Sequence, residues 1–257
     1  MLVLGQDNPN LGPEGHGYGV VKVDGYGRVS FAGTLADGAK VSQKVPLSKN
    51  GRWPLHSTAY SGQGGIHGWL TLTNGTTNDI RGTLAWARPA LPKERLYPDG
   101  FTSDTTVLGS LFIRPANSTN RVLNLTQTYI VFSGGNLSVA FTNAIVLSGK
   151  NQVTNRSDNK LSLSISTSSG LFSGTVLNPA TDKSSSFRGA VLQNQVGGGG
   201  FLLGTNRSAR VSFGLCRSPI TNTSDLYRIS TPKRMSDLFF SRNVHHNRKA
   251  GYLIFSP

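Results

Sequence analysis

Two histidines are the candidate acid–base residues within the stretch of alternating apolar and polar residues. His56 and His67 lie eleven residues apart, on either side of a Gly-rich turn. With a carboxylate from Asp37 or Asp79 they would form a base–orienter pair, the arrangement that activates a nucleophile. The nearby candidate nucleophiles are Ser57 and Ser61. Because the sequence has no Gly-x-Ser-x-Gly motif, we favour the simpler interpretation that both histidines are polar residues on exposed strand positions.

Glycoside hydrolysis needs two carboxylic acids placed on either side of the scissile bond. The only glutamates are Glu14 and Glu94, and each lies beside Gly or Pro in a loop-like stretch. The aspartates of residues 1–204 are scattered. We therefore predict that the protein is not an enzyme.

Calcium is the one metal for which the sequence offers a group of ligands. Asp7, Asn8, Asn10 and Glu14 are oxygen donors that a loop would be able to fold around Ca²⁺. Their spacing matches no EF-hand loop, and Asx residues that form turns explain them equally well. We predict no cofactor, with Ca²⁺ as the alternative.

Aromatic side chains form the strongest candidate for a binding surface. Trp53, Tyr60 and Trp69 lie on neighbouring predicted strands, and outward-facing rings of this kind would stack on sugar rings. Side chains alternate between the two faces of a strand, so Trp69 lies on the same face as Thr71 and is predicted to face solvent. Trp86 lies on the same face as Leu84 and is predicted to face inward. The alternative is that the tryptophans only fill a barrel core.

Glycines and turn-forming dipeptides divide the chain into short alternating runs. Gly makes up 31 of the 257 residues, and charged residues only 15%. Asx-Gly pairs at Asp24, Asp37, Asn50 and Asn74 separate apolar-alternating runs, and such pairs favour tight hairpin turns because both residues need positive φ. There is no apolar run of 18 residues, so we predict no transmembrane helix.

The same rhythm occurs twice. The stretch 27–35 leads to a Gly-rich stretch at 62–70, and 170–177 leads to 197–204. This approximate duplication predicts an all-β fold, an antiparallel meander of about twelve strands that is closed or nearly closed into a barrel from two similar halves. The alternative is two packed β-sandwich domains, divided near residues 89–105.

The organisation expected along the chain has three parts. Residues 1–16 are predicted to be an irregular lead-in, and residues 17–214 a β-domain with halves at about 17–105 and 106–214. Strand alternation does not continue into residues 215–257, which we expect to be a basic tail, poorly ordered or packed along an edge.

The net charge of +14 is unevenly distributed. Residues 1–204 contribute +7, and the last 53 residues, 205–257, contribute another +7. In the body the basic residues are spread over many strands and turns, as on a solvated sheet face, so we predict no specific binding of nucleic acid. Cys216 is the only cysteine, which excludes a disulfide within the chain.

Several motifs between residues 7 and 213 follow one another in a specific order. They are the stretches 21–24, 29–38, 46–55, 68–71, 97–102, 132–137, 170–174, 189–193 and 204–206. In this order they resemble a poorly characterised β-rich C-terminal module of large exported proteins from planctomycete and verrucomicrobial bacteria, where it often follows immunoglobulin-like repeats. The resemblance implies an extracellular or cell-surface location and neighbouring domains of a longer chain as partners, although the pattern of residues 1–5 does not predict a signal peptide.

We therefore expect a non-enzymatic structural or interaction module of an exported bacterial surface protein. The alternative is a carbohydrate-binding module that uses Trp53, Tyr60 and Trp69 to bind polysaccharide. A barrel embedded in lipid is the least favoured interpretation, because the strands are short and Gly-rich and lack girdles of aromatic residues.

Overall fold

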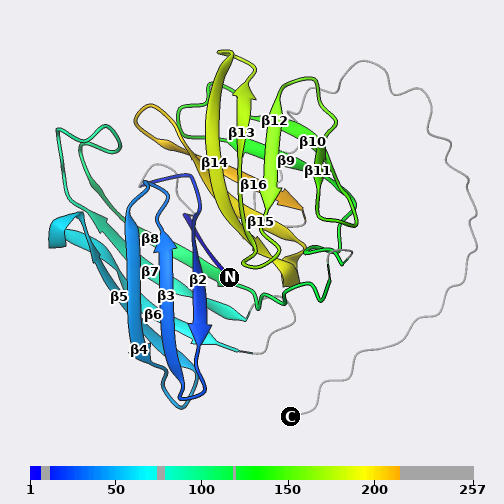
Figure 1. The fold of residues 1–257 in the computed structure, drawn as a ribbon. Helices are drawn as coiled ribbons and strands as arrows, with labels where there is room; N and C mark the ends of the chain where they lie inside the picture. Colours follow the sequence, from blue (N-terminus) through cyan, green and yellow to red (C-terminus); the bar gives the residue numbers. More distant parts are fainter. Residues whose placement is uncertain (7–11, 74–78, 118–119, 215–257) are drawn as a thin grey trace, which may run out of the picture. The chain divides into compact units, whose positions relative to one another are not determined.

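The structure, a computed structural model, consists of sixteen β-strands in two antiparallel sheets of eight (Figure 1). The residues that it describes are 1–6, 12–73, 79–117 and 120–214. Within these ranges the only helical segments are two 3₁₀ turns, η1 (Tyr60–Gly62) and η2 (Gln193–Gln195). The predicted basic tail, 215–257, lies outside the described residues, so its predicted state is not tested.

Each sheet comes from one half of the chain and curls into a nearly closed barrel. We call residues 2–109 barrel A; its strands are β1 (Leu2–Gln6), β2 (Gly17–Val23), β3 (Arg28–Thr34), β4 (Lys40–Pro46), β5 (Arg52–Ala59), β6 (Gly64–Leu72), β7 (Ile80–Arg88) and β8 (Phe101–Gly109). We call residues 127–214 barrel B; its strands are β9 (Gln127–Ser133), β10 (Phe141–Leu147), β11 (Val153–Asn155), β12 (Leu161–Ile165), β13 (Leu171–Asn178), β14 (Lys183–Leu192), β15 (Gly197–Leu203) and β16 (Ser208–Gly214).

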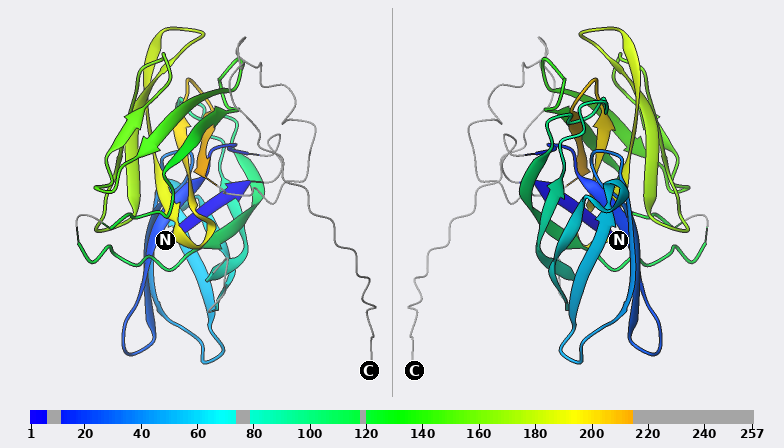
Figure 2. Two further views of the ribbon diagram at one scale, coloured as in Figure 1. Left: turned by 90° about the vertical axis from the view of Figure 1, so that its right-hand side faces the viewer. Right: turned by 90° about the vertical axis from the view of Figure 1, so that its left-hand side faces the viewer.

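Both barrels close in the same way, by pairing their first strand with their last. In barrel A, β1 pairs with β8, from Leu2 opposite Gly109 to Gln6 opposite Thr105. In barrel B, β16 pairs with β9. Each barrel therefore has a single seam without a backbone ladder, between β4 and β5 in barrel A and between β11 and β12 in barrel B. Figure 2 shows the strands of each sheet curving around in this way.

The seam of barrel A has a cause in the sequence. The carbonyl of Pro54 points to β4 and accepts a hydrogen bond from Gln43 Nε2 at 3.1 Å. The nitrogen of a strand residue points to the same side as its carbonyl, and proline has no N–H, so a ladder bond is lost here. Side chains replace the ladder, since Ser57 Oγ accepts from Ser42 N and donates to Ser42 O, both at 3.0 Å.

Asparagines fill the seam of barrel B. Asn143 is fully buried, and its Nδ2 donates to Asn155 Oδ1 at 3.2 Å and to the carbonyl of Asn159 at 3.1 Å. Asn159 in turn donates to the carbonyl of Leu177 at 2.9 Å. Both barrel edges are thus occupied by hydrogen-bonding side chains, which removes a template for pairing with another chain.

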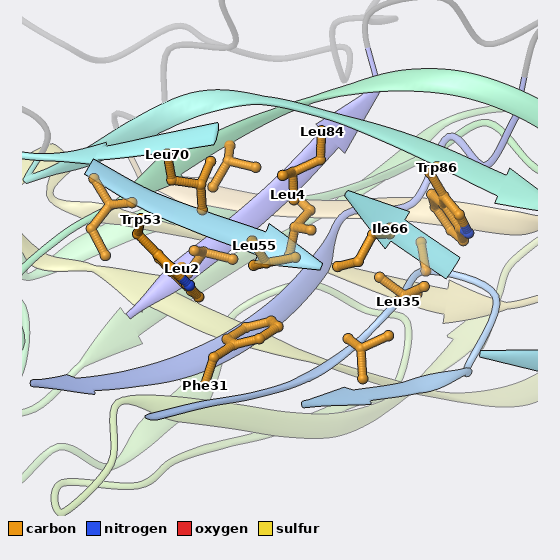
Figure 3. Close-up of a cluster of buried hydrophobic side chains, with 14 of the residues drawn as sticks. Leu2, Leu4, Phe31, Leu35, Trp53, Leu55, Ile66, Leu70, Leu84 and Trp86 are labelled. Atoms are coloured by element: carbon orange, nitrogen blue, oxygen red, sulfur yellow. The ribbon is translucent and has the colours of Figure 1, made fainter. Parts of the chain in front are cut away.

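The interior of barrel A is filled by side chains. Figure 3 shows Leu2, Phe31 and Trp53 pointing into the space between the strands. The ring centroids of Phe31 and Trp53 lie 5.5 Å apart in an edge-on contact. A second core of the same kind fills barrel B, with Phe132 and Phe187 fully buried. The period-2 burial along the strands confirms the predicted strand alternation.

The predicted all-β antiparallel meander of two similar halves is confirmed. The strands number sixteen rather than about twelve, and each half closes on itself. The predicted lead-in 1–16 is corrected at its start, because residues Leu2–Gln6, which begin with three apolar side chains, form β1 in the middle of a sheet. The boundary between the halves also moves, since β8 continues past residue 105 and β9 begins at residue 127.

A short segment outside the strands packs into barrel B. Residues 122–125 contain three apolar side chains but pair with no strand; Val122 and Leu123, which we call the plug, are buried in the core of barrel B. Asn151 Oδ1 accepts from Val122 N at 2.7 Å, and Gln193 Nε2 donates to the carbonyl of Val122 at 2.8 Å. The apolar pair therefore closes one end of barrel B, with its backbone bound by side chains.

The outer faces of the two barrels pack against each other at β15, where Gly199 and Gly200 contact the first half of the chain. A Cβ added to Gly199 would lie only 3.0 Å from both Val3 and His16 of barrel A and its lead-in. Tyr18 of β2 packs on Phe201, with ring centroids 5.9 Å apart. His16 N donates to the carbonyl of Gly200 at 2.9 Å. The predicted Gly-rich repeat thus permits close approach between the halves.

Candidate functional site

A buried polar cluster lies at one end of barrel A. It consists of Asp37, Tyr60, Trp86 and Arg88, and we call it the Asp37 cluster. Arg88 Nη1 donates to Asp37 Oδ2 at 2.7 Å, and the Tyr60 hydroxyl donates to the same oxygen at 2.6 Å. Trp86 Nε1 donates to the Tyr60 hydroxyl at 2.9 Å. The chain of hydrogen bonds therefore runs from the apolar core to the barrel end.

Local sequence explains how these groups meet. Asp37 begins a tight turn with Gly38, and its Oδ1 accepts from Ala39 N at 3.0 Å, which is an Asx turn. Trp86 and Arg88 share the inward parity of β7, and the Arg88 side chain is only 6% exposed. An arginine at the inward end of an apolar strand was the sequence signal for this cluster, and sequence reasoning missed it.

Burial raises the pKa of the Tyr60 hydroxyl far above its usual value, and the neighbouring carboxylate of Asp37 adds to the shift. Tyr60 therefore stays protonated and acts as a donor to Asp37. The guanidinium of Arg88 also lies 4.8 Å from the centre of the Tyr60 ring. Breaking the buried Asp37–Arg88 ion pair is costly, because the remaining charge would have no opposite charge beside it in the core.

The Asp37 cluster holds the loop between β7 and β8, residues 89–100, which we call the bridging loop. Arg88 Nη2 donates to the carbonyl of Leu96 at 2.7 Å. Farther along the loop, the Tyr97 hydroxyl accepts from Ser208 N of barrel B at 2.8 Å, and Arg95 Nη1 donates to the carbonyl of Thr205 at 2.9 Å. The loop therefore links the buried ion pair of barrel A to the β15–β16 hairpin of barrel B.

Three residues in or beside the bridging loop have a strained backbone conformation. Tyr60, Ser61 and Tyr97 have φ values of 54°, 56° and 49°, a left-handed conformation that is uncommon for residues other than Gly, Asn and Asp. A cleft of about 470 Å³ opens here, and Tyr60, Ser61 and Glu94 are among the residues that line it. Because Asp37 and Arg88 are already paired, the charge of this cleft is largely balanced.

The three predicted ligand-binding aromatics are not brought together. Trp53 is completely buried (0% exposed) and donates from Nε1 to Gln43 Oε1 at 2.9 Å. The prediction that Trp53 binds a surface ligand is therefore corrected, because its inward parity makes it part of the core. Tyr60 lies at the barrel end, whereas Trp69 is 54% exposed on the outer face. Trp69 faces outward and Trp86 faces inward, which confirms the predicted orientation of both side chains.

Trp69 lies on a face rich in polar side chains. Its cross-strand neighbours are Pro54 on β5 and Thr83 on β7, and the guanidinium of Arg52 lies 5.0 Å from its ring centre. His56 and His67 are exposed and directly opposite each other on the same face.

The catalytic hypothesis lacks its orienting carboxylate. Asp37 is engaged by Arg88 and Tyr60, while Asp79 Oδ2 accepts from Leu111 N at 2.6 Å and from Asn194 Nδ2 at 2.7 Å. Neither aspartate is therefore available to orient the two histidines.

Of the four predicted calcium ligands, Glu14 lies within the described residues. Its Oε1 accepts from Gly135 N of barrel B at 2.9 Å, so this carboxylate has a structural partner. Asp7, Asn8 and Asn10 lie outside the described residues. Within the described ranges, no three His, Cys, Asp or Glu side chains gather as they would around a metal ion.

Fold and site together define the chain as a tandem β-barrel protein. No protein-family model, curated protein or solved structure matches it. The resemblance to a module of exported bacterial proteins therefore stays a prediction. Among the described residues, no helix has the length and apolar character needed to span a membrane.

Proposed function

We propose that this chain is a non-enzymatic structural module of an exported bacterial surface protein, in which two barrels form one rigid support for neighbouring domains. The observation that carries the proposal is the bridging loop. Its anchor is the buried Asp37–Arg88 pair, and its far end is bound to barrel B through Arg95 and Tyr97. The charged groups of the Asp37 cluster and of the bridging loop are bound to other parts of the protein, which supports a structural role.

Other features support a structural role. Both barrel interiors are filled, and the seams are occupied by side-chain hydrogen bonds. Gly199 allows the outer faces to pack closely. A unit with filled cores and side-chain hydrogen bonds across its seams suits exposure to solvent beside other domains.

The non-enzymatic part is tested with a panel of ester, glycoside, peptide and phosphate substrates from pH 5 to 9. We expect no turnover above that of a buffer blank. Turnover that disappears in a His56→Ala, Ser61→Ala or Tyr60→Phe variant would refute it.

The surface location is tested by protease shaving of intact producing cells. Peptides from residues 12–214 should be released without lysis. Recovery of these peptides only after lysis would contradict a surface location.

A second candidate function, binding of carbohydrate, is favoured by one specific observation. Trp69 presents more than half of its surface on the outer face of barrel A, beside threonine hydroxyls of β6 and β7. A flat aromatic ring with hydrogen-bonding neighbours is the surface on which sugar rings pack. Tyr60 does not share this face, so the candidate site contains Trp69 alone of the three predicted aromatics.

A further inference from the structure

The outer face of strands β4–β7 has a strong charge asymmetry. These four strands are described over their whole length and contain no Asp or Glu. The exposed cations on them are Lys40, Lys44, Arg52 and Arg81. On the adjacent strand β8 the exposed carboxylate is Asp104, which lies opposite Ala85. The face around Trp69 is therefore a cationic surface at neutral pH.

The register of the sheet places the cations around the exposed ring. Arg52, Thr71 and Arg81 form one row across β5, β6 and β7. The next row is Pro54, Trp69 and Thr83. Because neighbouring strands lie about 4.8 Å apart, the Cα atoms of Arg52 and Arg81 are separated by roughly 10 Å, with Trp69 beside the line between them.

From this arrangement we infer that the β4–β7 face binds an acidic polysaccharide, one whose sugars carry carboxylate or sulfate groups. The inference rests on the second candidate function and adds its ligand class. The C–H face of a sugar ring packs on Trp69, and its acidic group pairs with Arg52, whose guanidinium already lies over the indole. Arg81 binds a second acidic group farther along the chain. His56, His67 and Thr83 supply hydrogen-bonding side chains at the rim.

A nucleic acid is the competing polyanion, and the aromatic content argues against it. Proteins that bind single strands stack successive bases on several aromatic side chains. On β4–β7 the exposed aromatic is Trp69, because Trp53 and Trp86 are buried in the core. One ring between two arginines suits a single sugar contact within a charged chain.

The test is a titration of the full chain with three probes: a polyuronate, a neutral glucan of matched length and a single-stranded oligonucleotide of matched charge. We expect saturable binding of the polyuronate that weakens as salt is added. Trp69→Ala and Arg52→Gln should each weaken it about tenfold, the size of one lost ring-stacking contact or one lost charge-assisted contact. Far-UV circular dichroism checks that both variants remain folded.

Matched controls lie on barrel B. Tyr129→Ala removes an aromatic ring that is 64% exposed, and Arg188→Gln removes an exposed strand cation. Neither should change binding. Equal loss in the barrel B variants would indicate non-specific charge attraction and overturn the inference.

The remaining outcomes separate the inference from the function on which it rests. Binding of the neutral glucan through Trp69 without dependence on Arg52 would overturn the acidic ligand and keep carbohydrate binding. Stronger binding of the oligonucleotide through the same residues would overturn the inference in favour of nucleic acid. Binding of none of the three probes would overturn both the inference and the second candidate function.

Discussion

At the scale of single residues, Asp37 accepts hydrogen bonds from Ala39, Tyr60 and Arg88, so its charge is compensated without water. The exposed pair Asp24–Arg28, 3.2 Å apart, offers a comparison of the same chemistry at the surface. Asp24 also accepts backbone hydrogen bonds, from Tyr26 N and Arg28 N at 2.9 Å each, but its ion pair is exposed whereas the Asp37–Arg88 pair is buried. The same substitution at the two aspartates therefore compares the stability that depends on a buried ion pair with that of an exposed one.

Asp37→Asn should destabilise the chain strongly, because Arg88 keeps its charge in a buried position without a carboxylate to compensate it. We expect a loss of about 3–5 kcal/mol in the free energy of unfolding, measured by urea denaturation. Asp24→Asn is the matched control and should change the midpoint little, since its carboxylate is solvated. Equal effects of the two substitutions would show that Arg88 finds another partner.

At the scale of elements, the sequence predicts most strands through alternation and hairpin turns, as at Val29 and Phe31. Prediction from the sequence fails where an apolar run is not an ordinary alternating strand. Leu2–Gln6 has too little alternation to distinguish a central strand, and Val122 with Leu123 looks like a strand because both are apolar. The Asp37 cluster was not predicted, because Asp37, Tyr60 and Arg88 meet only after barrel closure.

Leu123→Ala tests the plug of barrel B. The side chain is 1% exposed within the core, so its truncation should cost about 2–5 kcal/mol of stability through lost burial and a cavity. Leu111→Ala is the control, since Leu111 is 63% exposed and should tolerate truncation with little loss. Chemical denaturation measures both. A Leu123 variant as stable as the wild type would mean that the segment does not close the barrel.

At the scale of the whole molecule, the contacts between barrels include groups that respond to pH. His16 lies between β1 and β15, where burial first and the charge of Arg210 second lower its pKa from 6.5 to about 3. The folded chain therefore keeps His16 neutral, whereas the unfolded chain takes up a proton below pH 6.5. Stability from this group is complete above pH 6.5 and falls as the pH drops towards 3.

A His16→Asn variant should lose this dependence. Between pH 6.5 and pH 5 the wild type should lose about 1–2 kcal/mol more stability than the variant, at roughly 1.4 kcal/mol per pH unit. Urea midpoints at the two pH values give the comparison. Parallel losses in the two proteins would mean that His16 is protonated in the folded state.

The claim that the two barrels act as one unit is tested most directly by a difference in their tryptophan content. All three tryptophans, at positions 53, 69 and 86, lie in barrel A, so tryptophan fluorescence reports on barrel A while far-UV circular dichroism reports on both barrels. In urea, we predict that Leu123→Ala, a substitution in the core of barrel B, lowers the fluorescence midpoint as much as the dichroism midpoint, with one transition for each signal. A fluorescence midpoint that stays at the wild-type value while the dichroism curve splits into two transitions would contradict the account, because the barrels would then unfold independently.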